Sequence, residues 1–264
     1  YKIIIMFNLE KSSKFYWSNY LKDIDIERTP EIFKPKNRIE AYGIQNNFLK
    51  YTSYNLFGWK VAATSSNGQK HIGVAEPLAG RIFKEKVFKN QSKVSLGNNK
   101  MAVAEPEFAF KINKDIFPRK QIYSINEVLS FIDDLYPVIE LPNSRFTKYE
   151  IQGEEQLIAD NACAHFFIIG SKFNGLWKNF DLENHSVNIS NQNGKNYTGI
   201  GKNVLGNPII GLTWLINELS KYNITINKEL LVSTGTCTEP FPINTNDLIT
   251  ADFGILGKVQ VFIK

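Results

Sequence analysis

Cysteine is scarce in this sequence. The 264 residues include only Cys163 and Cys237, and no CxxC pair occurs. This excludes a disulfide framework and the paired-cysteine zinc motifs, and it agrees with a reducing compartment such as the cytoplasm. Neither cysteine has a convincing histidine partner in the sequence, so we do not expect a thiolate nucleophile.

Long hydrophobic runs and runs of charge are also missing. The opening segment YKIIIMF is apolar but far too short to cross a bilayer, and no cleavage-site pattern follows it, so we interpret it as a buried segment or a start-site artefact. The net charge is a modest +5, and the basic residues are scattered rather than clustered. The sequence therefore predicts a soluble cytoplasmic protein without a membrane or nucleic-acid partner.

Internal repeats and nucleotide-binding signatures are absent as well. The glycine-rich segment GIGKNVLG at residues 199–206 has neither the Rossmann nor the P-loop spacing, so no nucleotide cofactor is expected. What is present is ordinary for a globular protein, with 43% hydrophobic and 22% charged residues. The length fits one large domain, or a small N-terminal element followed by a main domain.

The pattern of apolar residues changes along the chain. Helical spacing in residues 10–22 and 37–51 predicts a helical N-terminal element. From about residue 57 the sequence reads as short strands punctuated by glycine and proline. We therefore predict an α+β fold, with a mostly helical element over residues 1–70 and a sheet-dominated body over residues 71–264.

Two helices are predicted within the body. A capping box of Ser124 and Glu127 precedes an apolar stripe from Val128 to Leu135, so we expect a helix here that Pro137 ends. Asn207 followed by Pro208 predicts the start of a second helix. The remaining segments predict strands at residues 138–141 and 165–170, a short helix in EEQLIADNACA, surface hairpins in residues 171–200 and strands to the C-terminus.

Three glutamates stand in apolar strand-like segments. Glu105 and Glu107, separated by Pro106, point to the same face of a strand, and Glu140 lies alone in YPVIEL. One interpretation is a solvated edge strand, which the proline would permit. The other is a site for a hard divalent cation, Mg²⁺ or Mn²⁺, because buried carboxylates are costly unless they are paired or bind metal.

Several long segments resemble the 2-keto-4-pentenoate hydratase group of the fumarylacetoacetate hydrolase superfamily. The resemblance covers roughly residues 36–264. It implies a mixed β-roll with flanking helices, assembly into dimers or larger homo-oligomers, and a Mg²⁺ or Mn²⁺ site formed by Glu105, Glu107 and Glu140. The segments that carry it, in chain order, are GWKVAATS, GVAEPLAG, AVAEPEFAF, VIELPNSRF, LIADNACAHFFIIG, GKNVLGNPIIGLTWLINEL and STGTCTEPFPINTNDLITADFGILGKVQVF.

The resemblance also implies an activity. The expected reaction is the metal-dependent addition of water to a 2-hydroxy-2,4-dienoate from the degradation of aromatic compounds, which gives a 4-hydroxy-2-oxo acid. Two alternatives stay open: the decarboxylation of a 4-oxalocrotonate-type diacid, and a catalytically silent protein that binds the metal and the 2-oxo acid. The implied partners are a small 2-oxo or 2-hydroxydienoic acid, further copies of the chain and an enzyme of the same pathway.

Three further residues match the family's segments. Lys60 in GWKVAATS is expected to hold the substrate carboxylate or to move protons, although a surface lysine whose stem lies along apolar groups is the alternative. Asp160 in ADNA and Thr236 in TGT are expected to bind substrate. The alternatives are a helix cap for Asp160 and a turn after a strand for Thr236.

One segment departs from the family pattern. Many hydratases read GVDxPDFG where this chain reads GVAEPLAG, so that Ala75 and Leu78 replace two aspartates. This favours the decarboxylase alternative more than an intact motif would. We therefore expect another group to transfer protons, with His71 as the candidate catalytic residue and Arg81 as a candidate substrate-binding residue; Glu76 lies in the same segment.

Overall fold

The computed structural model describes residues 7–264. The opening segment that we interpreted as buried or as an artefact lies outside this range, apart from Phe7. Among the described residues, no helix has the length and apolar character needed to cross a membrane. The α-helices are α1 (Leu9–Lys22), α2 (Arg38–Tyr51), α3 (Ser66–His71), α4 (Ile125–Leu129), α5 (Glu154–Ala159) and α6 (Pro208–Lys221).

The strands within residues 7–264 form two sheets. The larger sheet has eight strands: seven follow the order β2-β1-β10-β5-β6-β7-β3, and β11 pairs with β5 beside this path. The smaller sheet has the order β4-β13-β12-β8-β9. The bounds are β1 (Leu56–Ala62), β2 (Leu78–Phe83), β3 (Val87–Lys89), β4 (Ser92–Val94), β5 (Val103–Ile112), β6 (Ile132–Leu141), β7 (Phe166–Ile169), β8 (Ser186–Asn191), β9 (Asn196–Ile200), β10 (Leu231–Thr236), β11 (Phe241–Pro242), β12 (Leu248–Asp252) and β13 (Lys258–Ile263).

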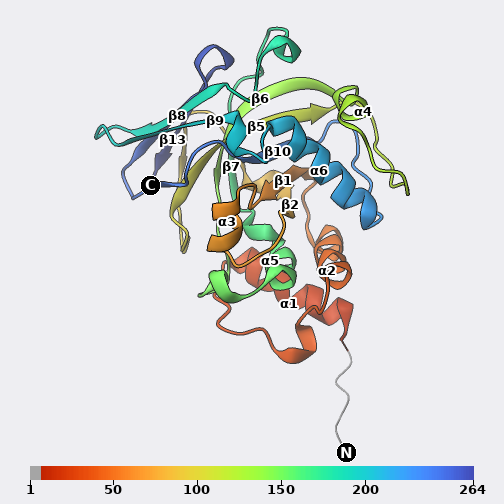
Figure 1. Ribbon diagram of the computed structural model, residues 1–264. Helices are drawn as coiled ribbons and strands as arrows, with labels where there is room; N and C mark the ends of the chain where they lie inside the picture. The colour runs from red at the N-terminus through yellow and green to blue at the C-terminus, as the bar shows by residue number, and fades with distance from the viewer. Residues whose placement is uncertain (1–6) are drawn as a thin grey trace, which may run out of the picture.

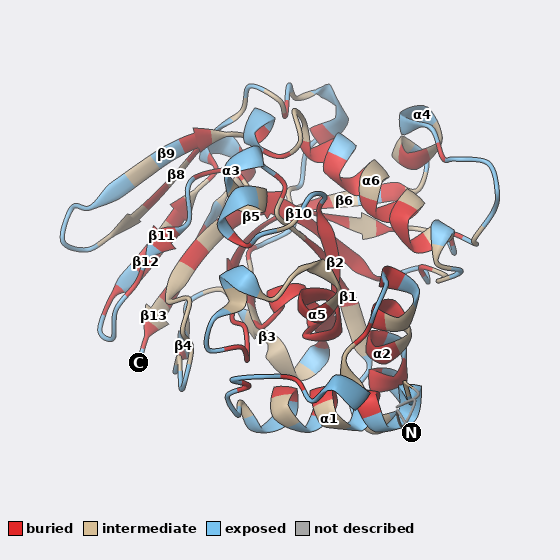
Figure 2. Ribbon diagram, turned by 60° about the horizontal axis from the view of Figure 1, so that its bottom comes forward, coloured by how far each residue is buried: buried red, intermediate tan, exposed pale blue. Residues whose placement is uncertain are grey.

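The predicted α+β class is confirmed by this arrangement. The larger sheet is strongly curled, helix α6 lies along it, and α1, α2 and α5 gather beyond its β1–β2 end (Figure 1). Buried residues line the inner faces of the strands and the sides of the helices that turn toward them (Figure 2). The core is therefore enclosed between the curled sheet, its covering helices and the smaller sheet.

The N-terminal helices form where their apolar spacing predicts them. Trp17 of α1 packs its ring 5.2 Å from that of Phe48 on α2 and 5.6 Å from that of Phe83 on β2, measured between ring centroids. These contacts fix α1 and α2 against the edge of the larger sheet. Strand β1 lies within residues 1–70 and pairs with β10 and β2 of that sheet. The division of the chain at residue 70 stays a prediction.

The two helix starts in the body lie where they were predicted. The side chain of Asn207 accepts a hydrogen bond of 2.9 Å from the N–H of Ile209 before α6, and Ser124 forms a capping box with Glu127 before α4. The predicted extent of the helix that follows Ser124 is wrong. Helix α4 ends at Leu129 and β6 begins at Ile132, because pairing with β5 along this segment outweighs the local helical spacing.

Strand β5 lies inside the larger sheet, so the interpretation of Glu105 and Glu107 as a solvated edge is wrong. β5 pairs with β6 on one side and with β10 and β11 on the other. Pro106 instead marks an interrupted ladder. It lies between Glu107, the partner of Thr236 on β10, and Ala104, the partner of Phe241 on β11. Next to this gap, the register with β10 shifts between Ser233 and Thr236, which places one extra residue on β10 opposite Glu107–Ala109, as in a β-bulge.

Candidate metal and substrate site

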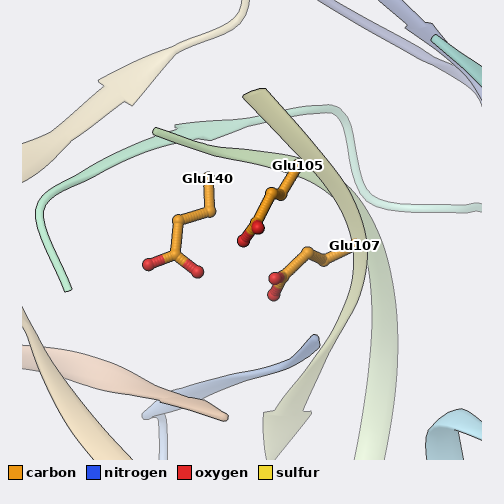
Figure 3. Close-up of side chains that lie close together, drawn as sticks. All are labelled: Glu105, Glu107 and Glu140. Carbon is orange, nitrogen blue, oxygen red and sulfur yellow. The ribbon is translucent and has the colours of Figure 1, made fainter. Parts of the chain in front are cut away.

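Three carboxylates meet on one face of the larger sheet. Glu105 on β5 is paired directly with Glu140 on β6, and Glu107 lies two residues further along β5 on the same face. One oxygen from each lies within 4.8 Å of the others. Figure 3 shows the three side chains extending from the two strands toward a common point.

These carboxylates are withdrawn from water. Glu107 and Glu140 are 1% and 0% exposed, and Glu105 is partly buried. Burial raises the pKa of all three, to about 7 for Glu105 and well above its ordinary value for Glu140. Like charges so close together are unfavourable unless a cation compensates them, so the cluster calls for positive charge.

Lys60 supplies part of this charge. Its ammonium on β1 lies 3.1 Å from Glu140 Oε1 and donates a hydrogen bond of 3.2 Å to the carbonyl of Ala162. Burial lowers the pKa of Lys60, but the summed charges of Glu140, Glu105 and Glu107 outweigh this effect and leave it raised. The interpretation of Lys60 as a surface side chain is therefore wrong, since it is 2% exposed.

Two residues that the sequence analysis missed hold Glu107 in place. The hydroxyl of Ser233 and the N–H of Gly235, at 3.1 Å, both donate to Glu107 Oε2. Gly235 has φ +106, and a side chain there would collide with Thr64 at 2.3 Å. The available signal was the run of small residues in LVSTGT, but its position beside Glu107 depends on the pairing of β10 with β5.

The donor set fits a hard divalent cation. Among residues 7–264, Glu107 Oε1 and Glu140 Oε2 are buried and have no hydrogen-bond or ion-pair partner, and Glu140 Oε1 has only the ion pair with Lys60. Unpaired buried oxygens of this kind are rare and need a ligand. Carboxylate oxygens without sulfur or nitrogen ligands are typical of Mg²⁺, Mn²⁺ and Ca²⁺ sites, and three protein ligands leave positions for a substrate.

Of the three predicted substrate-binding residues, Thr236 lies beside this cluster, whereas Asp160 supports the segment that follows β6. Asp160 is buried and accepts hydrogen bonds from the Ser144 hydroxyl, at 2.8 Å, and from Arg145 Nε, at 2.6 Å. It thereby fixes the segment that follows Glu140 and β6. Thr236 is the register partner of Glu107 at the end of β10, and its hydroxyl donates to the carbonyl of Thr238.

Arg81 is not brought to the glutamates. It is the register partner of Trp59, whereas Lys60 is the partner of Gly80, so the Arg81 and Lys60 side chains point to opposite faces of the β1–β2 pair. The guanidinium lies 4.3 Å over the Trp59 ring and donates to the side chain of Gln45 on α2. Its position fixes α2 against the sheet.

The other residues of this segment are dispersed. Leu78 is fully buried and points to the same face as Lys60, so an apolar group stands where the family pattern predicts an aspartate. Glu76 faces outward, 3.6 Å from Arg38. His71 is exposed at the end of α3, and its Nε2 lies 3.4 Å from the hydroxyl of Tyr149.

The cysteines are unsuited to nucleophilic chemistry. Burial raises the pKa of Cys163 to about 12 and that of Cys237 well above its ordinary value. A thiol with a raised pKa carries little thiolate at neutral pH, which agrees with the expectation that neither acts as a nucleophile.

The chain is similar in sequence to known hydratases and decarboxylases. No family model matches the chain. The chain is 25% identical over 223 residues to a 2-keto-4-pentenoate hydratase of Paraburkholderia phymatum, which covers 83% of this chain and 84% of the relative. It is 28% identical over 137 residues to a 4-oxalocrotonate decarboxylase of Pseudomonas putida, or 52% of this chain and 51% of the relative.

A solved structure extends the likeness to the whole fold. The 4-oxalocrotonate decarboxylase of Pseudomonas putida G7, complexed with magnesium and adipate, superposes with a TM-score of 0.86 at 21% identity over 97% of each chain. The predicted β-roll fold is confirmed by this agreement.

Proposed function

We propose that the chain belongs to the hydratase and decarboxylase group of the fumarylacetoacetate hydrolase superfamily, and that it is a carbon–oxygen lyase that hydrates a 2-hydroxy-2,4-dienoate. The observation that carries this proposal is the buried cluster of Glu105, Glu107 and Glu140 with the Lys60 ammonium beside it. Such a site suits a small acid with two adjacent oxygens.

The reaction requires two proton movements. As the dienol becomes the ketone, the proton leaves the 2-hydroxyl and a proton is added at C5. Water then adds across the remaining double bond, with its hydroxyl at C4 and a proton at C3, so that one water is consumed and no oxidant is needed. The product is a 4-hydroxy-2-oxo acid. A site for this reaction must hold the carboxylate end of the substrate and stabilise negative charge at its 2-oxygen.

The residues of the chain divide these tasks. Glu105, Glu107 and Glu140 would hold a divalent cation, with Mg²⁺ as our first choice and Mn²⁺ as the second, and this ion would supply Lewis-acid stabilisation of negative charge on the substrate oxygens. The Lys60 ammonium binds the substrate carboxylate. Ser233 and Gly235 keep Glu107 oriented, and Asp160 keeps the segment after Glu140 in place. Thr236 is proposed as a further contact to the carboxylate.

A second candidate function is the decarboxylation of a 4-oxalocrotonate-type diacid. The buried Leu78 on the face of Lys60 favours it, because an apolar group cannot transfer the protons that hydration requires. In decarboxylation the distal carboxylate leaves as CO₂ and its electron pair moves through the conjugated carbons to the 2-oxygen. The 2-oxygen then takes up one proton. This reaction makes a smaller demand on acid–base groups.

One assay separates these functions. Purified protein with Mg²⁺, and in parallel with Mn²⁺, is offered 2-hydroxypenta-2,4-dienoate and 4-oxalocrotonate, while dienol absorbance and CO₂ release are followed. Loss of dienol absorbance without CO₂ is the expected result. Release of CO₂ from 4-oxalocrotonate, with no turnover of the dienoate, would show that the protein is a decarboxylase and not a hydratase. Binding of both acids without turnover would identify a catalytically silent protein.

His71 is proposed as the group that exchanges protons with solvent, through the hydroxyl of Tyr149. Replacing His71 with alanine should lower kcat by at least about a hundredfold, the lower range for loss of a general acid or base, and leave metal affinity unchanged. The matched control is His185→Ala, because the His185 ring contacts the backbone of Phe253 instead. Unchanged turnover and unchanged substrate affinity in the His71 variant would remove it from the mechanism.

The remaining expectations about organisation are also proposals. We propose a functional division between residues 1–70 and residues 71–264, and assembly of the chain into a homo-oligomer, with a partner enzyme of the same pathway. Size-exclusion chromatography with light scattering measures the first assembly directly, and co-purification with candidate pathway enzymes tests the second.

A further inference from the structure

A short buried turn beside the metal site has an unusual backbone. Asn161, Ala162 and Cys163 have φ values of 62°, 51° and 59°, so three consecutive residues are left-handed and none of them is glycine. Asparagine tolerates this region, but alanine and cysteine lose about 1–2 kcal/mol each there. Left-handed residues in series persist only when the surrounding structure imposes them, and they cluster at functional sites.

Asn161 fixes one end of the turn to the sheet. Its side-chain Oδ1 accepts from the N–H of Arg81 at 2.7 Å, and its Nδ2 donates to the carbonyl of Arg81 at 2.8 Å. Because β2 ends the strand order of the larger sheet, this side chain occupies the position that a further strand would take. The amide therefore replaces a missing pair of backbone hydrogen bonds and holds the turn against the sheet.

Gly80 lets the turn approach closely. A Cβ at Gly80 would lie 2.3 Å from the carbonyl oxygen of Asn161 and 3.2 Å from the Cβ of Ala162. Gly80 is also the register partner of Lys60 in the β1–β2 pair, so the turn covers the face along which the lysine side chain extends. The carbonyl of Ala162 consequently lies within 3.2 Å of the Lys60 ammonium.

This carbonyl gives the ammonium a partner outside the carboxylate cluster. Lys60 Nζ lies between Glu140, at 3.1 Å, and the Ala162 carbonyl, at 3.2 Å. With the glutamates alone, the ammonium would move among three negative charges and occupy the place that suits a divalent cation. A fixed carbonyl keeps the ammonium at the border of the cluster, where it can meet the carboxylate of a substrate.

We propose that the left-handed turn Asn161–Cys163 is a positioning device, in which the Ala162 carbonyl holds Lys60 away from the centre of the carboxylate cluster. The role in turnover depends on the proposed function, whereas the effect on metal binding does not. Metal affinity therefore tests the device even if the substrate assignment fails.

The test is a double-mutant cycle on metal affinity. Ala162→Gly keeps the positive φ accessible but lets the turn adopt other conformations, so the carbonyl is no longer fixed. In the protein that retains Lys60, the Ala162→Gly change should weaken Mg²⁺ binding about fivefold, as measured by isothermal titration, and lower kcat/KM about tenfold. In the Lys60→Met background it should leave Mg²⁺ affinity unchanged, because no ammonium competes with the metal.

A purely structural role predicts a different pattern. An equal loss of Mg²⁺ affinity in both backgrounds, or no loss in either, would overturn the proposal. Ala164→Gly is the matched control, since Ala164 is buried beside the turn with an ordinary φ of −63°; it should lower the melting temperature without coupling to Lys60. If Ala162→Gly does not fold, Asn161→Gly, which keeps the positive φ accessible and removes both hydrogen bonds to the Arg81 backbone, should give the same cycle.

Discussion

Replacing Glu107 with glutamine is expected to remove the response of the protein to divalent metal and to lower turnover by at least about a hundredfold, since even groups that only orient a metal ligand contribute as much. The glutamine oxygen can still accept from Ser233 and Gly235, so the local fold should survive. Its amide nitrogen would then take the place of Glu107 Oε1, which has no hydrogen-bond partner among residues 7–264. A donor would thus face the cluster where an anionic ligand is needed.

Thermal unfolding with and without Mg²⁺ measures this effect. A ligand at a hundred times its dissociation constant stabilises a folded protein by about 2.7 kcal/mol, and the variant should lose this stabilisation entirely. Without metal, the variant should be more stable than the parent protein, because one of three buried like charges has been removed. A variant that is still stabilised by Mg²⁺ would contradict the assignment of Glu107 as a ligand.

Glu218→Gln is the matched control for Glu107→Gln. Glu218 is equally a buried carboxylate, but it pairs with Arg38 at 2.6 Å and accepts from the Tyr42 hydroxyl, away from the cluster. Its replacement should lower the melting temperature and leave the Mg²⁺ response intact. The comparison therefore separates loss of a ligand from loss of a buried charge.

Replacing Lys60 with methionine should lower kcat/KM by at least about a hundredfold and, at the same time, strengthen metal binding. The ammonium lies 3.1 Å from Glu140 Oε1, so its removal takes away both the ion-pair partner of Glu140 and a competitor for the metal. Breaking a buried ion pair costs about 3–5 kcal/mol, which should appear as a lower melting temperature without metal and a larger gain when Mg²⁺ is added.

Two measurements decide this second case. Isothermal titration gives the Mg²⁺ affinity, and steady-state kinetics with the dienol substrate gives kcat and KM. Lys84→Met is a suitable control, because the Lys84 ammonium lies over the ring of the half-buried Phe57, 4.6 Å from its centroid, and not among the glutamates. Weaker or unchanged metal binding in the Lys60 variant would show that the ammonium does not compete for the site.

The sequence indicated the proposed metal ligands better than it indicated the residues around them. The two-residue spacing of Glu105 and Glu107 places both on one face of any strand, and this holds whatever the strand pairs with. The contribution of Glu140 depends on the register of β6 against β5. Its isolated position in an apolar segment made it a candidate, and the likeness to a known family grouped it with the other two. Arg81 was chosen from its position in the segment, and the sequence alone does not reveal that β1 pairs with β2 so as to turn it away.

Other features were hidden because distant pairing decided them. The stripe from Val128 to Leu135 has helical spacing, yet the second half of it becomes strand through its contact with β5. Likewise, nothing in the letters NAC predicts a left-handed turn, since alanine and cysteine disfavour it. The hydrogen bonds of Asn161 to the β2 edge impose it, and they exist only once the sheet has formed.

Strand β10 separates β1 from β5 in the larger sheet, although both precede it by more than a hundred residues in the chain. During synthesis from the N-terminus, β1 with β2 and β5 with β6 can pair early, but the two units meet only when residues 231–236 arrive. Until then, two strand edges stay open to other chains, which is a recognised hazard for aggregation. Completion of the site is therefore a late event in folding, and a chain that stops before residue 231 would carry all three glutamates without Ser233 and Gly235, which orient Glu107.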